Sequence, residues 1–384
     1  MSTPPHSSAL DLLRRYGRDT MRGTLLDQNY PRTRCSTMLG LLQKTMLILS
    51  ALLAATQAEA QALPRAADAA LRRGIAAQKQ GDLETAIHSL EDADRAAPNQ
   101  LQVQRPLLFA YVQAGQIPDA LRLGKTAVER WPRDAEIQHG LGLAYFKSGQ
   151  NDRAREALTL AAKLSPSNFG THFDLALVML TTQDYSGATR ELETSIKLDP
   201  KDALAHLLLG RAYQNTNRSQ DAVQQFRTAL QLDSSVPLGH YNLGFAYESL
   251  GEQSRALREY REEVAHNPNH PEVRYRLGHC LLEMGDWKEA IAELRLATSL
   301  DRRNGDAYYD LGKALFMSGD TGGAIEALRT ATQLNASDPS PHYLLARALE
   351  KSGNQAEADA EWARFNELKK AHPASGGMAT GRNQ

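Results

Sequence analysis

From Ala67 onward, hydrophobic and small residues return to the same places every 34 residues, without insertion or deletion. Within each 34-residue frame the apolar positions lie three or four apart, as on one face of an α-helix. The seventh, eighth and eleventh positions, such as Leu141, Gly142 and Tyr145, form one such face. Glycine at the fifteenth position of most frames, for example Gly81, suits the left-handed turn that ends a helix. The pattern therefore predicts two helices in each frame, joined by a tight turn.

Nine frames follow one another from Ala67 to His372. They are 67–100, 101–134, 135–168, 169–202, 203–236, 237–270, 271–304, 305–338 and 339–372. The twentieth position is alanine in every frame, and the eighth is glycine or alanine except at Leu108. The seventh is leucine except at Arg73. Two helices approach closely only where side chains are small, so the eighth and twentieth positions should meet inside each hairpin.

This pattern resembles the tetratricopeptide repeat, whose Leu-Gly-x-x-Tyr signature recurs here at 141–145, 209–213 and 243–247. The resemblance implies an all-α fold, a right-handed superhelical solenoid of antiparallel helix pairs with a concave inner surface. A single hairpin cannot bury its apolar face, so stability in such an array comes from contacts between neighbouring hairpins.

The two ends of the array depart from the pattern. In the first frame Ala70 and Arg73 replace larger apolar residues on a helix with no predecessor. In the last frame Trp362 and Phe365 stand where earlier frames hold residues such as Leu294 and Ala297. Two interpretations stay open for these aromatic residues. They can fold down as a cap over the final hairpin, or they can form an exposed patch used for dimerisation. Residues 373–384 are expected to be disordered.

A ten-residue apolar run, Met46 to Ala55, precedes the array. It follows Lys44 and is followed by the small-residue pattern Ala58-Glu59-Ala60, so residues 38–60 are predicted to be a secretory signal peptide. Ten helical residues rise about 15 Å, about half of the hydrocarbon core of a bilayer, which favours a signal over a permanent anchor. Residues 1–37 are either a disordered leader or an over-extended start. We therefore expect an exported protein, periplasmic or secreted, that meets the membrane only through this transient segment.

Composition and charge narrow the possible partners. The chain is 42% hydrophobic and 23% charged, which is typical of a globular protein, and its net charge of −1 favours no nucleic-acid partner. Its two cysteines are too few for a disulfide framework. Cys280 stands where most other frames have alanine, which indicates a small core residue.

No catalytic motif stands out in the sequence, and we expect no enzyme activity, no cofactor and no metal. His172, His206 and His240 recur at the fourth frame position, 34 residues apart. Packed helices lie about 8–10 Å apart, whereas zinc needs each ring nitrogen at about 2.0–2.1 Å. These histidines are therefore interpreted as packing residues.

The second, fifth, ninth and twelfth frame positions form another helical stripe, which in the tetratricopeptide family lines the concave groove. Tyrosines supply rigid contact area and arginines bind carboxylates, so this stripe is the candidate protein-binding site. The candidate residues, which include some sixth-position neighbours, are Tyr241, Asn242, Phe245, Tyr275, Arg276, His279, Tyr309, Lys313, Tyr343 and Arg347. Alternatively, the tyrosines merely fill space between successive helices.

In the first half of the array the same stripe is apolar. It carries Phe109, Leu143, Phe146, Phe173, Leu177, Leu180, Leu204 and Leu207. This floor either holds an apolar partner segment or is a partly occluded inner surface. We expect an exported interaction scaffold that binds a protein or peptide in its groove. The alternative is an accessory subunit that docks a separate envelope enzyme in polysaccharide or outer-membrane assembly.

Overall fold

The computed structural model describes residues 63–371, and this part of the chain is helical, without strands. The helices are α3 (Arg65–Lys79), α4 (Leu83–Ala96), α5 (Leu101–Gln113), α6 (Ile117–Arg130), α7 (Ala135–Lys147), α8 (Asn151–Leu164), α9 (Phe169–Thr181), α10 (Tyr185–Leu198), α11 (Ala203–Asn215), α12 (Ser219–Leu232), α13 (Gly239–Ser249), α14 (Gln253–His266), α15 (Pro271–Glu283), α16 (Trp287–Leu300), α17 (Gly305–Ser318), α18 (Thr321–Leu334), α19 (Pro339–Ser352) and α20 (Gln355–Ala371). The leader 1–37, the signal peptide 38–60 and the tail 373–384 lie outside the described residues. None of the helices in residues 63–371 combines the length and the apolar character that crossing a membrane requires.

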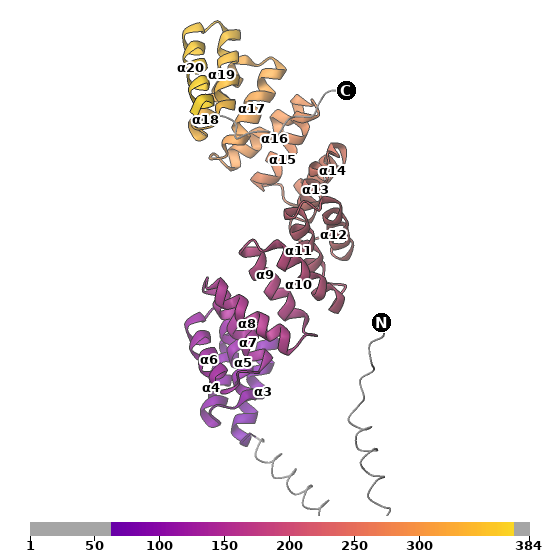
Figure 1. Ribbon diagram of the computed structural model, residues 1–384, viewed down its shortest axis with the longest axis vertical. Coiled ribbons are helices and arrows are strands. Elements are labelled where there is room, and N and C mark those ends of the chain that lie inside the picture. Colours follow the sequence, from indigo (N-terminus) through magenta and orange to yellow (C-terminus); the bar gives the residue numbers. More distant parts are fainter. Residues whose placement is uncertain (1–62, 372–384) are drawn as a thin grey trace, which may run out of the picture. The chain divides into compact units, whose positions relative to one another are not determined.

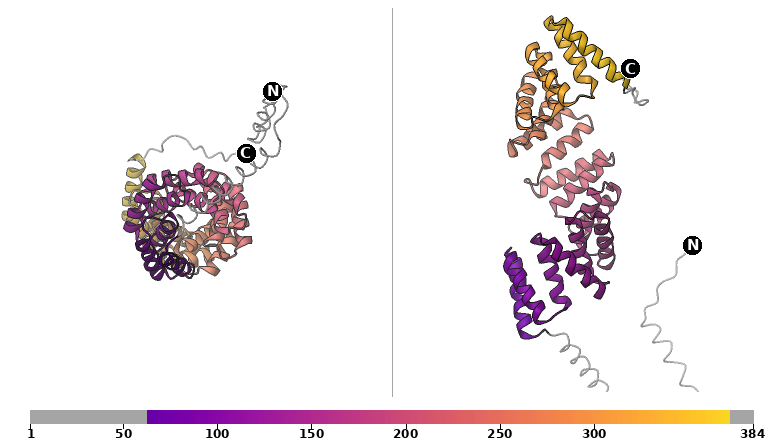
Figure 2. Two further views of the ribbon diagram at one scale, coloured as in Figure 1. Left: turned by 90° about the horizontal axis from the view of Figure 1, so that it is seen from below. Right: turned by 90° about the vertical axis from the view of Figure 1, so that its left-hand side faces the viewer.

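Each odd-numbered helix packs against the even-numbered helix that follows it, and each even-numbered helix packs against the next odd-numbered one (Figure 1). Figure 2 shows the same succession of helix pairs from two further directions. We number these pairs as hairpins, from hairpin 1 (α3–α4) to hairpin 9 (α19–α20). The all-α repeat array expected from the sequence is confirmed.

Small residues bring the two helices of each hairpin together. The alanine at the twentieth frame position has no exposed surface in any of the nine hairpins of the described chain. A Cβ atom added to Gly210, at the eighth position, would lie 2.5 Å from the ring of Phe226 at the twenty-fourth. Hairpin 2 reverses this arrangement, since the buried Leu108 stands at the eighth position and Gly124 at the twenty-fourth. One small and one large residue thus share the contact, whichever helix carries the small one.

The turn inside each hairpin has a left-handed residue at the fifteenth frame position. Seven hairpins use glycine there, with φ between 73° and 94°, as the sequence predicts. Hairpins 4 and 5 reach the same conformation with Gln183 (φ 61°) and Asn217 (φ 59°). Asparagine tolerates the left-handed backbone region better than most residues. The turn that contains Asn217 lies beside the site described below.

Most first helices begin at a capping side chain, as at Asp202, whose Oδ1 accepts a hydrogen bond from the Ala205 amide at 2.6 Å. Helix α13 is different. The corresponding residue is Val236, which has no acceptor and is buried, and Leu238 adopts φ 56°. The helix therefore begins only at Gly239 and is the shortest first helix within the described residues, with 11 residues.

Candidate functional site

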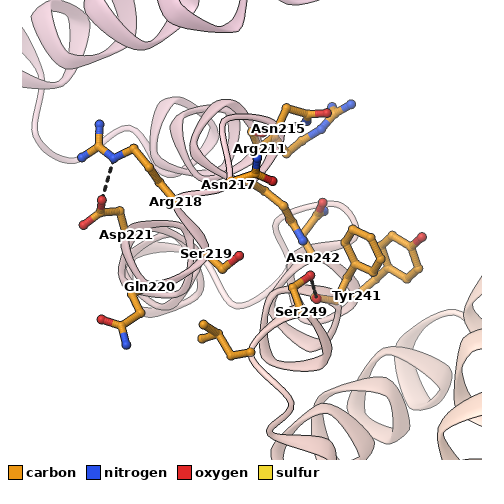
Figure 3. Close-up of a pocket in the computed structure, with 13 residues that line it drawn as sticks. Arg211, Asn215, Asn217, Arg218, Ser219, Gln220, Asp221, Tyr241, Asn242 and Ser249 are labelled. Carbon is orange, nitrogen blue, oxygen red and sulfur yellow. Dashed lines mark hydrogen bonds and ion pairs between the residues drawn. The ribbon is translucent and has the colours of Figure 1, made fainter. Parts of the chain in front are cut away.

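A pocket of about 900 Å³ opens between hairpins 5 and 6. Its lining comes from the C-terminal half of α11, the turn into α12, and α13. These residues are Arg211, Gln214, Asn215, Asn217, Arg218, Ser219, Gln220, Asp221, Tyr241, Asn242, Phe245, Ser249 and Leu250. Figure 3 shows Arg211 and Asn215 of hairpin 5 beside Tyr241 and Asn242 of hairpin 6. Three of the residues predicted from the sequence, Tyr241, Asn242 and Phe245, thus meet in one pocket.

The aromatic part of the pocket is fixed by packing on the core. Tyr241 is half-buried, and its ring centroid lies 6.2 Å from that of Tyr260. Burial raises the pKa of Tyr241, so its hydroxyl stays protonated at neutral pH and can donate a hydrogen bond. Phe245 is also half-buried, with the Arg276 guanidinium carbon 5.0 Å from its ring centroid. One face of each ring is therefore held by the protein, and the pocket side remains open to a ligand.

The polar part of the pocket has unused hydrogen-bonding capacity. The Nε2 atom of Gln214 is buried and has no hydrogen-bond partner among the described residues. Arg211 is exposed, and its guanidinium forms no ion pair within residues 63–371. By contrast, Arg218 pairs with Asp221 at 2.7 Å. Arg211 therefore offers free donors to an oxygen-bearing ligand, whereas the Gln214 amide would have to turn toward the pocket before it could donate to one.

Arg211, Gln214 and Asn215 were not among the residues predicted from the sequence. Their positions could have indicated them, because Arg211 and Gln214 occupy the ninth and twelfth positions of frame 203–236. The same two positions of the next frame carry Phe245 and Glu248 on the groove stripe. The prediction followed the tyrosines at the fifth position, which begin one frame later.

Arg276 is held by the chain's own carboxylates. Its Nε donates to Glu272 Oε1 at 3.0 Å, and its Nη1 lies 3.7 Å from Glu248 Oε1. Glu248 also accepts a hydrogen bond of 2.6 Å from the buried Tyr260 hydroxyl. The positive charge proposed as an anchor for a partner is therefore already balanced, and Arg276 contributes chiefly by covering Phe245.

His279 and Lys313 are engaged in the same way across hairpins 7 and 8. His279 Nδ1 donates to Asp310 Oδ2 at 2.8 Å, and this hydrogen bond is the main cause that raises the pKa of His279. Lys313 Nζ lies 2.9 Å from Glu283 Oε1. Both pairs join a residue of α15 to one of α17, so they link neighbouring hairpins at the groove stripe.

The remaining tyrosines of the stripe differ in exposure. Tyr275 and Tyr309 are half-buried and pack against the core, and burial raises the pKa of both. Tyr343 is 40% exposed and lies beside Trp362, with ring centroids 5.3 Å apart. Tyr275 and Tyr309 thus fill space between helices and also present surface to the groove. Tyr343 packs mostly against other residues of hairpin 9.

Arg347 is the charged residue of the predicted set that has no ion pair within the described part of the chain. Its guanidinium carbon lies 5.7 Å from the Phe316 ring centroid and 6.0 Å from that of Tyr343. Lys351 approaches Phe316 from the same helix, with its Nζ at 5.0 Å. Hairpins 8 and 9 therefore present uncompensated positive charge above an aromatic surface.

Comparison with known proteins agrees with this architecture. Models described as tetratricopeptide repeats match residues 110–169, 191–224, 216–251, 247–315 and 309–373. The chain belongs to the tetratricopeptide repeat family. No curated protein matched it in sequence.

Several solved structures are similar to parts of this chain. The APC/C hetero-tetramer Cut9–Hcn1 is 17% identical with a TM-score of 0.50, over 70% of this chain and 52% of that one. YrrB, described as a TPR protein with an unusual peptide-binding site, is 23% identical with a TM-score of 0.44, over 49% and 97%. MamA from Desulfovibrio magneticus RS-1 is 21% identical with a TM-score of 0.43, over 45% and 98%.

The apolar stripe in the first half of this tetratricopeptide array is largely half-buried. Phe109, Leu143, Phe146, Phe173, Leu177 and Leu180 are all half-buried. Leu207 is only 4% exposed, whereas Leu204 is 42% exposed. The neighbouring His139 is also engaged, since its Nε2 lies 2.7 Å from Asp174 Oδ2. Packing therefore accounts for much of this stripe, and Leu204 is its most accessible large residue.

The recurring histidines have a structural role inside the hairpins. The Nδ1 atoms of His172, His240 and His342 each bond to a glutamate 19 residues later, at 2.7, 2.8 and 2.6 Å. These bonds tie the first helix of a hairpin to the second. Cys280 is buried, and burial raises the pKa of its thiol to about 11, so the thiol stays protonated at neutral pH.

Proposed function

We propose that this chain is a scaffold that binds an extended segment of a partner protein along its groove, with the pocket between hairpins 5 and 6 as the main anchor. The observation that supports this most is the pairing of two aromatic rings, Tyr241 and Phe245, with the exposed and unpaired guanidinium of Arg211 around one pocket. Curved helical-repeat arrays present extended binding surfaces of this kind.

The chemistry of the pocket suits a peptide. Gln214, Asn215 and Asn242 carry amide groups that can donate to and accept from a peptide main chain. Arg211 can bind a carboxylate with two parallel hydrogen bonds, from an acidic side chain or a chain terminus. Tyr241 and Phe245 can cover an apolar side chain of the same segment. Arg347 is the proposed second anchor, and Tyr275 and Tyr309 supply surface between them.

The proposal can be tested by crosslinking in intact cells. A photoreactive residue is placed at Ser249, which is exposed and lines the pocket, and at the exposed Arg190 of α10 as the control. A specific crosslink to a protein is expected from Ser249 only. Equal crosslinking from both positions would contradict the groove as the binding site.

Variants then separate binding from folding. Arg211→Ala and Asn215→Ala change exposed side chains, so helical content should be unchanged while the Ser249 crosslink falls about tenfold or more. Arg190→Ala serves as the matched arginine control. If the captured partner is an envelope enzyme, the chain is an accessory subunit of that enzyme rather than an assembly scaffold.

We also propose that the protein is exported, on the basis of the apolar segment 46–55 and the Ala58-Glu59-Ala60 pattern. Amino-terminal sequencing of the protein from fractionated cells tests this. A mature chain beginning at Gln61 is expected in the envelope or secreted fraction. A chain retaining residues 1–37 in the cytoplasmic fraction would refute both the export and the cleavage.

A further inference from the structure

We infer that the array stacks end to end, with α3 of a second copy seated on the open face of hairpin 9. The partner is identified by comparison with a junction inside the chain, where α15 packs on α14 of hairpin 6. Each half of that internal junction recurs at one end of the array. This inference concerns the two ends of the described array, and its test measures self-association rather than binding of the proposed groove ligand.

The internal junction has a receiving half and an inserting half. In hairpin 6, Glu248 at the twelfth position accepts a hydrogen bond from Tyr260 at the twenty-fourth, at 2.6 Å. In α15, Arg276 at the sixth position is oriented by Glu272 at the second, at 3.0 Å, and reaches Glu248 at 3.7 Å. Once α15 is in place, Tyr260 has no exposed surface.

Hairpin 9 repeats the receiving half. Trp362 at the twenty-fourth position donates from Nε1 to Glu350 Oε1 at the twelfth, at 2.8 Å. Tyr343 packs on Trp362 as Tyr241 packs on Tyr260. Here, however, no helix of the described chain follows, and Glu350 and Tyr343 remain exposed while Trp362 is only half-buried.

Helix α3 repeats the inserting half. Arg72 at the sixth position donates from Nε to Asp68 Oδ2 at the second, at 2.9 Å, in the same arrangement as Arg276 and Glu272. The Arg72 side chain is 79% exposed, and Asp68 is its one ion-pair partner within the described residues. A helix placed like α15 on hairpin 9 would bring Arg72 to Glu350, as Arg276 reaches Glu248.

The shapes of the two ends also complement each other. Ala69, Arg73 and Ala76 are exposed on α3, where α15 has the buried Val273, Leu277 and Cys280. The opposite end is enlarged, since Trp362 and Phe365 replace leucine and alanine. The smaller α3 face leaves room for the larger aromatic face, and the Arg73 guanidinium can lie over an aromatic ring.

Polar capping alone explains only one end. Terminal repeats need a polar outer face for solubility, which Arg72 and Arg73 supply on α3. The half-buried rings of Trp362 and Phe365 on hairpin 9 do not supply such a polar face, because they leave apolar surface exposed to water. A head-to-tail contact uses different surfaces on the two copies, so it does not close and should give assemblies that grow with concentration.

Sedimentation velocity of the full-length protein over a wide concentration range tests the inference. The mean mass should rise with concentration. Arg72→Glu and Glu350→Arg should each weaken self-association about tenfold or more, because each places like charges together at the junction. The double variant Arg72→Glu/Glu350→Arg restores opposite charges and should recover most of the association.

Two further variants serve as controls. Ala76→Arg adds bulk on the exposed face of α3 and should also block stacking, without disturbing the buried core. Arg190→Glu changes an exposed charge on α10 and should leave the mass distribution unchanged. A protein that stays monomeric at every concentration would overturn the inference. So would self-association that ignores all the end variants, or a double variant that stays as weak as the single ones.

Discussion

Adding one methyl group at Gly210 should destabilise hairpin 5. A Cβ atom there would lie 2.5 and 2.6 Å from two ring carbons of Phe226, whereas relaxed carbon contacts are about 3.5–4.0 Å. Phe226 is fully buried, so its ring cannot move into solvent. Overpacking of this kind costs about 1–3 kcal/mol, while alanine gains about 1 kcal/mol over glycine in a helix. The net loss for Gly210→Ala is therefore at most about 2 kcal/mol, and we expect a value near this upper end because two carbons of a fully buried ring clash with the new methyl group.

The measurement is the free energy of unfolding in urea, together with hydrogen exchange of the α11 and α12 amides. Exchange is needed because a repeat array can open locally, so a loss in one hairpin is best read at that hairpin. Gly322→Ala in α18 is the control. Its Cβ would meet nothing closer than an Asp320 oxygen at 3.9 Å, so that variant should be neutral or slightly stabilising.

The chain itself supplies the compensating change. Hairpin 4 pairs Ala176 at the eighth position with Leu192 at the twenty-fourth, and both are fully buried (1% exposed or less). Gly210→Ala combined with Phe226→Leu should therefore be more stable than the sum of the two single effects, by about 1 kcal/mol or more. Strictly additive effects, or a neutral Gly210→Ala, would refute the idea that this contact is sterically limited.

Two other predictions concern buried hydrogen bonds. Tyr260→Phe removes the hydrogen bond to Glu248 and should lower the free energy of unfolding by about 1.5–3 kcal/mol. The control is Tyr247→Phe, because the Tyr247 hydroxyl has no hydrogen bond in the described chain. This variant should lower the free energy of unfolding by less than about 0.5 kcal/mol. The hydrogen bond to Asp310 raises the pKa of His279 above its ordinary 6.5. The unchanged protein should therefore be more stable than His279→Gln, with the full difference present below pH 6.5 and lost as the pH rises through the pKa of His279 in the folded protein. Unfolding curves measured across this pH range check the expectation. A stability difference that grew with pH would contradict it.

Much of the fold could be predicted because the same contact repeats in each frame. The buried alanines and the left-handed glycines follow from local sterics, which a 34-residue register makes visible. The compensation of Leu108 by Gly124 is also readable, since both residues break the pattern in the same frame. The late start of α13 is not, because it depends on the burial of Val236 and on the positive φ of Leu238, which only the packed structure reveals.

The candidate site was predictable to a lesser degree. The helical stripe brings Tyr241 and Phe245 to one pocket because both lie on the same face of α13. The pairing of Arg276 with Glu272 could have been foreseen from their spacing of four residues on one helix, whereas the contact with Glu248 could not, since Glu248 belongs to the preceding hairpin and the contact depends on how two hairpins stack. Residue type alone suggested a free cation at Arg276, whereas the unpaired guanidinium in the lining of this pocket is that of Arg211.

The half-buried tyrosines determine how the groove should be tested. Tyr275 packs one face on the core, so Tyr275→Ala removes packing as well as binding surface, and a loss of partner would be ambiguous. Tyr275→Phe keeps the packed ring and removes only the hydroxyl. If the hydroxyl bonds a ligand, this variant should weaken binding about threefold to tenfold while helical content and unfolding stay unchanged. If Tyr275→Phe binds normally and only Tyr275→Ala fails, with an equal loss of stability, the ring serves stacking and the groove contact lies elsewhere.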